Sequence, residues 1–263
     1  MPCIPTFTSL GHGPLVVLLH GSGGGFRSFA PQVETLASLG FRAVAWNMPG
    51  YGLSVPVEPY TFKGLAESAA ALIDGLTAEG GAPVALVGQG MGGMVAQELV
   101  LRRPELVRQL VLVATAAAVL PADGYAEHIA LGERWLAEGL EMAQIAKTLI
   151  PRVVGSGALP EGMALATFCQ RQVPAATWRH ALQAMRGFDR RAALAHIHVP
   201  TLLVAGEQDP VAPPTAMQSM AGAMSGAELL CLPATGHLPH LEQPDAFDAA
   251  LLDFLRRARP RLH

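Results

Sequence analysis

Short apolar runs along the chain alternate with longer stretches whose apolar residues recur at helical spacing. The runs that predict β-strands are PLVVLLHG (14–21), FRAVAW (41–46), PVALVG (83–88), LVLVAT (110–115), PTLLVAG (200–206) and AELLCLP (227–233). The stretches that predict helices are 28–39, 61–79, 91–103, 213–224 and 243–258. Because strand–helix–strand units build parallel sheets, this alternation predicts an α/β fold with a mostly parallel central sheet and helices on both faces.

The alternation stops between residues 118 and 196. Segments rich in Ala, Met and Leu here have helical spacing and are punctuated by prolines, and no strand is expected. We therefore predict a core formed by residues 1–117 and 197–263 and an inserted helical cap over 118–196. An insertion at the carboxyl ends of parallel strands lies where such folds bind ligands, so the cap is expected to cover the pocket and select the substrate.

Composition narrows the class of protein. Of the 263 residues, 51% are hydrophobic and 15% are charged, and the formal net charge is -3. This composition allows a sizeable core and offers no basic surface for nucleic acid. The three cysteines show neither CxxC pairing nor metal-ligand spacing, as expected of free thiols in a reducing compartment.

The pattern predicts neither export nor membrane insertion. The N-terminal stretch MPCIPTFTSLGHG lacks the basic start and apolar stretch of a signal peptide, and no apolar run approaches the ~18 to 20 residues of a membrane helix. We expect a cytoplasmic monomer or homodimer without metal or cofactor. Its expected partner is a small molecule, and neither nucleic acid nor a membrane.

The segment VALVGQGMGGMVAQEL (84–99) joins a predicted strand to a predicted helix through a glycine-rich turn. Its spacing is that of the G-x-S-x-G nucleophile elbow, in which a strained turn lifts the central side chain into the pocket. In this chain the central position is Gly90, flanked by Gly88 and Gly92. Glycine has no side-chain atom that could attack a carbonyl, so no acyl-enzyme can form at this position.

The same glycines allow a second interpretation. Gly88, Gly90 and Gly93 spell G-x-G-x-x-G, a pattern of dinucleotide-binding turns. That pattern belongs to the first strand of such folds and requires an acidic residue at the end of the next strand. Here the strand is the third parallel one and no acid ends the next strand, so a dinucleotide site is less favoured.

Two further polar residues stand directly after predicted strands. Asp209 follows the strand at 200–206, and His237 follows the strand at 227–233. Nucleophile position, acid and histidine then occur in the chain order of an α/β-hydrolase triad, each at the carboxyl end of a strand. Taken singly, Asp209 could be a turn residue before proline and His237 a surface residue, but their joint placement favours a catalytic pair.

The glycine-rich turn after the first long strand, residues 20–25, can direct backbone N–H groups at an anion. We predict an oxyanion hole formed by the N–H groups of Ser22 and Met91, where one donor is worth ~3 to 4 kcal/mol in comparable sites. His20 is expected to order this turn and not to act as an acid or base.

Five segments together resemble the α/β-hydrolase superfamily over nearly the whole chain, namely LLHGSGGG, AWNMPGYGLS, VGQGMGGMVAQEL, LLVAGEQDP and GHLPHLEQP. With GFDRRAALAHIHVPTLLVAGEQD, the chain is most similar to the capped branch that contains 3-oxoadipate enol-lactonases and meta-cleavage-product hydrolases. The resemblance implies an α/β-hydrolase fold and hydrolysis of a small, mainly apolar ester, lactone or carbon–carbon diketone.

Three features depart from this family. Gly90 stands where the family has Ser, Cys or Asp, and Asn47 stands where it usually has Asp. We expect Asn47 to tie its loop by side-chain hydrogen bonds. The short N-terminal segment is expected to lack one edge strand of the family's sheet.

The glycine at the elbow leaves three hypotheses. The first is a serine hydrolase whose nucleophile was replaced, by engineering or by natural loss, and whose activity is strongly impaired. In the second, His237 oriented by Asp209 acts as a general base without a covalent intermediate. The third is a non-catalytic protein that binds a small molecule.

Other side chains could contact the substrate or replace the nucleophile. Arg134, Trp135 and Arg171 of the cap are candidate substrate-binding residues, with packing or solvated side chains as the alternative interpretation for each. Ser22 and Cys169 are less favoured as nucleophiles, because Ser22 is needed for its N–H and a cysteine in a cap helix is more often inert.

Overall fold

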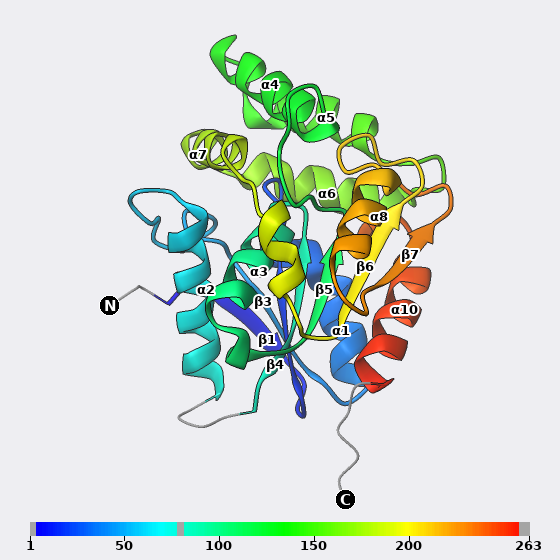
Figure 1. Ribbon diagram of the computed structural model, residues 1–263. Helices are drawn as coiled ribbons and strands as arrows, with labels where there is room; N and C mark the ends of the chain where they lie inside the picture. Colours follow the sequence, from blue (N-terminus) through cyan, green and yellow to red (C-terminus); the bar gives the residue numbers. More distant parts are fainter. Residues whose placement is uncertain (1–3, 78–81, 258–263) are drawn as a thin grey trace, which may run out of the picture.

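The computed structural model describes residues 4–77 and 82–257, which form a seven-stranded sheet flanked by helices (Figure 1). The strands are β1 (Phe7–Leu10), β2 (Leu15–Leu19), β3 (Arg42–Trp46), β4 (Val84–Gln89), β5 (Val107–Val113), β6 (Thr201–Gly206) and β7 (Glu228–Leu232). Their order across the sheet is β1-β3-β2-β4-β5-β6-β7. All neighbouring strands are parallel except β1, which runs antiparallel to β3.

Alternation along the strands divides the core into two layers. In β2, Val16 and Leu18 belong to the apolar cluster that α1 and α10 cover, whereas Val17 and Leu19 belong to the cluster that α2, α3 and α8 cover. Successive strand side chains point to opposite faces, so both faces of the sheet are buried. These helices are α1 (Ala30–Ser38), α2 (Phe62–Thr77), α3 (Met91–Arg102), α8 (Pro214–Ala223) and α10 (Pro244–Arg257). The predicted α/β-hydrolase fold is confirmed.

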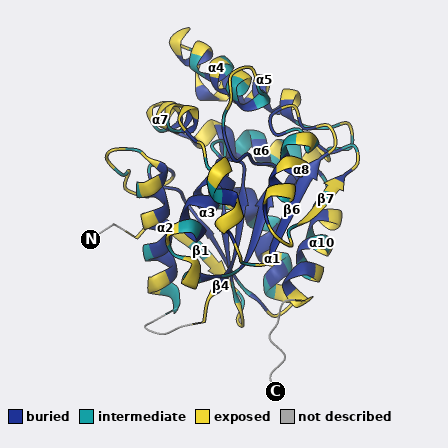
Figure 2. Cartoon of the chain, in the orientation of Figure 1, coloured by how far each residue is buried: buried dark blue, intermediate teal, exposed yellow. Residues whose placement is uncertain are grey.

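Residues 118–196, the expected cap, are helical. They contain α4 (Gly124–Ala137), α5 (Met142–Val153), α6 (Pro160–Gln172), α7 (Ala175–Arg186) and the short 3-10 helix η3 (Arg191–His196). Helix α5 packs on α6 and α4 packs on α7. In Figure 1 these four helices lie above the sheet, and Figure 2 shows the buried strands beneath them. The loops that follow the strands therefore meet the cap helices.

Several element boundaries differ from the sequence-based expectation. The expected helix at 28–39 begins as a 3-10 turn, Phe26–Phe29, before α1, and the short helix α9 (Pro239–Glu242) precedes α10. Strand β1 was not expected, because four half-exposed residues give too short a pattern. The segment before residue 14 thus supplies an edge strand of the sheet. The last expected residues of two helices, 78–79 and 258, lie outside the described residues.

No helix within residues 4–77 and 82–257 combines the length and the apolar character that crossing a bilayer requires.

Candidate active site

Gly90 forms the turn between β4 and α3. Its backbone has φ 55° and ψ -122°, a conformation in the left-handed range that L side chains rarely adopt. The Gly90 N–H donates to Val113 O at 2.9 Å, and Thr115 Oγ1 donates to Gly90 O at 2.7 Å. A Cβ on Gly92 would collide with the backbone carbonyl of Leu19. The turn therefore has the sharp, closely packed geometry of a nucleophile elbow.

The loops after β6 and β7 bring Asp209 and His237 together. His237 Nδ1 lies 2.9 Å from Asp209 Oδ2, and the Asp209 side chain has no exposed surface. The other carboxylate oxygen, Oδ1, accepts the N–H groups of Val211 and Ala212 at 2.8 and 3.0 Å. These donors fix the carboxylate, which in turn favours the imidazole tautomer with a proton on Nδ1 and a free lone pair on Nε2.

The free nitrogen of His237 faces the elbow. A Cβ built on Gly90 would lie 3.5 Å from His237 Nε2, 3.7 Å from Gly21 Cα and 3.7 Å from Tyr125 Oη. These are ordinary van der Waals distances, so a Cβ at this position collides with no neighbouring atom. The three sequence-predicted positions Gly90, Asp209 and His237 are thus brought together.

Ser22 and Met91 also line this site. Tyr51 Oη donates to Ser22 O at 2.8 Å and so holds the Ser22 peptide group. Within residues 4–77 and 82–257, neither the Ser22 nor the Met91 N–H donates to a protein acceptor. Met91 is the first residue of α3, where backbone N–H groups and the helix dipole favour negative charge. Both residues thus line the cavity with N–H groups that no described protein atom accepts.

His20 has the ordering role expected from the sequence. Its Nε2 accepts the Met48 N–H at 3.0 Å, so Nδ1 carries the proton and donates to Gly21 O at 2.8 Å. Burial lowers the pKa of His20 to about 4, which keeps the ring neutral. Asn47 ties its loop in the same way, because Oδ1 accepts the Phe26 N–H and Nδ2 donates to Thr6 Oγ1.

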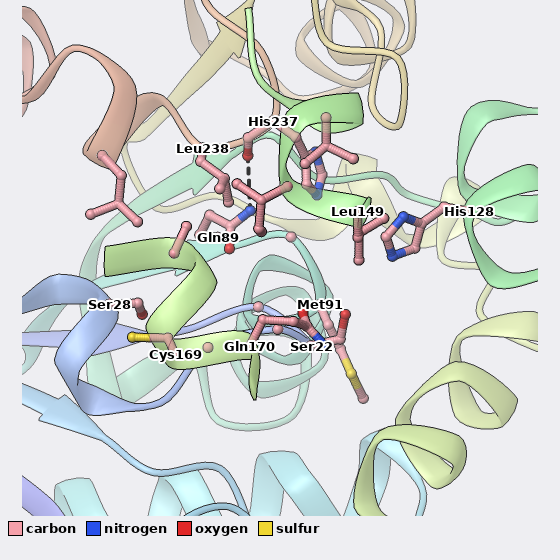
Figure 3. Close-up of a pocket in the computed structure, with 18 of the residues that line it drawn as sticks. Ser22, Ser28, Gln89, Met91, His128, Leu149, Cys169, Gln170, His237 and Leu238 are labelled. Carbon is pink, nitrogen blue, oxygen red and sulfur yellow. Dashed lines mark hydrogen bonds between the residues drawn. The ribbon is translucent and has the colours of Figure 1, made fainter. Parts of the chain in front are cut away.

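A cavity between the strand ends and the cap joins these groups (Figure 3). The volume open to the centre of a water molecule is ≈ 60 Å³, several times what one water requires. None of its described lining residues is Lys, Arg, Asp or Glu, and the described part of the chain holds no cluster of three or more His, Cys, Asp or Glu suited to a metal. The cap contributes Tyr125, His128, Leu149, Ile150, Val153, Ala166, Cys169 and Gln170.

Burial holds three titratable side chains of the cavity wall neutral, those of His128, His240 and Cys169. Burial, reinforced by the nearby His237, lowers the pKa of His128 to about 4 and that of His240 to about 3. Burial also raises the pKa of Cys169 to about 11, so its thiol is a poor nucleophile at neutral pH. The wall therefore supplies polar groups without a fixed charge.

Glu242 is a residue whose role the sequence did not reveal. Its side chain is buried in α9, and Oε2 accepts the N–H groups of Gly155 and Gly236, each at 2.7 Å. Oε1 accepts the Leu238 N–H at 2.8 Å. One carboxylate thus fixes the residues on either side of His237 and links them to the cap. The motif GHLPHLEQP contains this glutamate, but no spacing rule indicates where its side chain points.

Gln170 and His240 were also missed. Both line the cavity and are nearly fully buried, at 2% and 1% exposure. Gln170 Nε2 and both ring nitrogens of His240 have no hydrogen-bond partner among the described residues. The His240 ring stacks on Phe29 with ring centroids 4.5 Å apart. The Gln170 amide lies against Gly23, because a Cβ on Gly23 would collide with Gln170 Oε1.

The expectation that three cap residues bind substrate needs correction. The structure places none of them at the cavity. Arg134 is 64% exposed and lies near Glu138 on the outer side of α4. Trp135 packs into the apolar core, and Arg171 is exposed over the Phe168 ring. Helix α4 instead turns Tyr125 and His128 inward, since residues three or four apart share a helix face.

Comparison with known proteins assigns the family. A model described as "Alpha/beta hydrolase family" matches residues 16–250. The chain belongs to the alpha/beta hydrolase family. It is 29% identical over 248 residues to a pimeloyl-[acyl-carrier protein] methyl ester esterase of Neisseria meningitidis, covering 91% of this chain and 93% of that one. It also matches the biotin biosynthesis bifunctional protein BioHC of Cellvibrio japonicus at 27% identity over 246 residues, which are 92% of this chain but only 47% of that protein.

Solved structures show the same fold. A thermophilic esterase from Thermogutta terrifontis superposes with a TM-score of 0.86 at 26% identity, covering 97% of this chain and 94% of the esterase. The enol-lactonase from Burkholderia xenovorans superposes with a TM-score of 0.83 at 25% identity, covering 95% and 96%. The relatives of this alpha/beta hydrolase thus include esterases and a lactonase.

Proposed function

We propose that this chain is an esterase- or lactonase-type hydrolase of small, mainly apolar carbonyl compounds in which Gly90 has replaced the serine nucleophile. One observation supports the proposal above the others. A Cβ at residue 90 would lie 3.5 Å from His237 Nε2, so a serine hydroxyl on that carbon comes within hydrogen-bonding range of a histidine already paired with Asp209.

The cavity wall supports an uncharged substrate. Leu149, Ile150 and Val153 give it an apolar surface, and burial keeps the imidazoles of His128 and His240 neutral. The Asp209 carboxylate lies buried behind His237. A ligand that carries a free carboxylate besides the reacting carbonyl would have to bury it in this cavity. The carboxylate would lose its hydration without gaining a cationic partner.

The chemistry of the native chain is limited because residue 90 provides no nucleophile. The N–H groups of Ser22 and Met91 can stabilise charge that develops on a carbonyl oxygen, and His237 can move a proton, but no side chain at residue 90 can form an ester with the acyl group. We therefore infer that the native activity is far below that of a complete triad and goes without a covalent intermediate at this residue.

Restoring the nucleophile tests the proposal. Gly90→Ser is expected to raise kcat/KM for 4-nitrophenyl butyrate at least about 10³-fold, because it adds a positioned nucleophile to an assembled base and acid. Gly90→Ala is the matched control, since it adds the same Cβ without the hydroxyl. Gly90→Ser/His237→Ala removes the base and should return to the Gly90→Ala rate.

Mass spectrometry tests whether hydrolysis passes through an acyl-enzyme at residue 90. Rapid quenching of the Gly90→Ser protein should show an acyl group on the peptide that contains residue 90, and the native chain should show none there. A Gly90→Ser protein that is folded but hydrolyses aryl esters and lactones no faster than Gly90→Ala would refute the proposal and leave a binding protein as the better interpretation.

A further inference from the structure

Glycine at residue 90 leaves room between two polar side chains. The nearest polar side-chain atoms to the Cβ position are His237 Nε2 at 3.5 Å and Tyr125 Oη at 3.7 Å. Both residues line the cavity whose volume of ≈ 60 Å³ admits water. A water molecule next to Gly90 is thus within reach of hydrogen bonds to His237 and to Tyr125. Tyr125 was not among the site residues expected from the sequence.

Tyr125 is fixed in an orientation suited to accept such a bond. It is 3% exposed, it lies in the first turn of α4, and its Oη donates to Ala114 O at 3.0 Å. The ring meets His237 edge-on, with centroids 5.8 Å apart. Burial raises the pKa of Tyr125 well above its usual value, so the group remains a neutral hydroxyl. Because its proton is committed to Ala114, the oxygen offers lone pairs to a second partner.

We propose that His237 and Tyr125 hold a catalytic water beside Gly90, and that this water hydrolyses activated carbonyl substrates directly. Tyr125 is the positioning residue of this site. One water hydrogen donates to His237 Nε2 and the other to Tyr125 Oη, which leaves an oxygen lone pair to face a carbonyl carbon. The amides of Ser22 and Met91 receive the carbonyl oxygen.

The reaction balances without a cofactor. His237 Nε2 takes a proton from the water as its oxygen bonds to the carbonyl carbon, and the C=O electron pair moves onto the oxygen held by the two amides. When the tetrahedral intermediate collapses, the oxyanion electron pair re-forms C=O, the bond from carbon to the leaving oxygen or sulfur breaks, and that atom takes the proton from His237. The products are a carboxylic acid and an alcohol, phenol or thiol.

This proposal rests on the proposed function, since it uses the same cavity and base. It also narrows the substrate class of the native chain. Water is a weaker nucleophile than an activated alkoxide, so the direct route requires aryl esters, thioesters or strained lactones with a good leaving group.

The experiment compares Tyr125→Phe in two backgrounds. In the native chain, Tyr125→Phe should lower kcat for 4-nitrophenyl butyrate about tenfold, because one hydrogen bond that orients the water is lost, with KM changed less than about twofold. In the Gly90→Ser protein the serine hydroxyl attacks the ester and water is needed only to hydrolyse the acyl-enzyme. The same substitution should therefore change kcat/KM, which reports the acylation step, less than about twofold. A merely structural role for Tyr125 would lower both rates equally.

Tyr60→Phe is the matched control, because Tyr60 Oη also donates to a backbone carbonyl, Pro49 O, at 3.0 Å and does not line the cavity. It should leave both rates unchanged. Gly90→Ala is a second variant that does not depend on Tyr125: its methyl group occupies the water position and should reduce the native rate to that of His237→Ala.

The outcomes separate this inference from the proposed function. A Gly90→Ser protein that is active, together with a native rate that neither Tyr125→Phe nor Gly90→Ala changes, overturns the water site and leaves the proposed function standing. An inactive Gly90→Ser protein together with a native rate that depends on His237 and Tyr125 supports the water site and overturns the serine-type proposal. If Tyr125→Phe lowers the rate by the same factor in the native chain and in the Gly90→Ser protein, the water site is also overturned.

Discussion

The loop that carries His237 and the turn that carries Gly90 are held by different means. In the loop 233–243, side-chain groups satisfy the backbone: Glu242 alone accepts three N–H groups, and Gln89 Nε2 donates to His237 O at 3.0 Å (Figure 3). In the turn, glycines let backbone segments approach, and a Cβ on Gly92 or on Gly88 would clash with backbone atoms.

The comparison shows where the site tolerates change. Close backbone packing holds the turn in its elbow geometry with glycine at its centre, because the neighbouring glycines and the strand–helix contact carry the shape. The loop depends on individual polar side chains, so removing one of them leaves buried N–H groups without acceptors. The nucleophile position can therefore change without rebuilding the site, whereas the loop around His237 cannot.

The largest expected effect is at Glu242. Glu242→Ala leaves the N–H groups of Gly155, Gly236 and Leu238 without their acceptor and should lower the free energy of unfolding by about 3 kcal/mol or more. Urea unfolding followed by circular dichroism measures it. Glu228→Ala, in an exposed ion pair with Arg257, is the control and should change stability by less than about 0.5 kcal/mol. An unchanged midpoint for Glu242→Ala would show that the loop is held by packing alone.

The next prediction concerns His240, the one polar side chain of this loop that lacks a hydrogen-bond partner among the described residues. Burial lowers the pKa of His240 from its usual value of about 6.5 to about 3, so unfolding takes up a proton below about pH 6.5 and stability falls as the pH falls towards 3. His240→Phe removes this proton uptake and keeps the stack on Phe29. The loss of unfolding free energy between about pH 7 and about pH 5 should shrink by about 2 kcal/mol.

Chemical unfolding at both pH values measures this difference. His198→Phe, at an exposed position before β6, is the matched control and should leave the pH dependence nearly as it is. An equal pH dependence in the native chain and in His240→Phe would mean that folding does not lower the pKa of His240.

The smallest expected effect is at the turn itself. Gly90→Ala places an L side chain at φ 55°, a strain of about 1 to 3 kcal/mol that is partly offset by the lower entropy of the unfolded chain. The net loss should be about 1 kcal/mol, seen as a lower thermal midpoint. Gly139→Ala, at φ 78° with nothing within 4 Å of its Cβ, is a control for positive φ without a site. A Gly90→Ala protein more stable than the native chain would contradict the idea of a strained elbow.

The sequence determined the sheet, its flanking helices and the chain order of the site. Strands such as β4 and β6 are continuous apolar runs, and the residues at their carboxyl ends must meet at one edge of a parallel sheet. For this reason Gly90, Asp209 and His237 could be placed together from periodicity and motifs. The missing nucleophile could also be seen in the sequence, because it depends on the identity of one residue.

Only the tertiary structure decided which cap side chains face the cavity. Arg134 and Trp135 were expected there, but α4 turns Tyr125 and His128 inward, and the rotation of a helix about its axis is set by packing against the core. The same holds for Glu242, whose three backbone partners lie in two segments, the cap and the loop around His237. Such contacts depend on distances between elements that no spacing along the chain encodes.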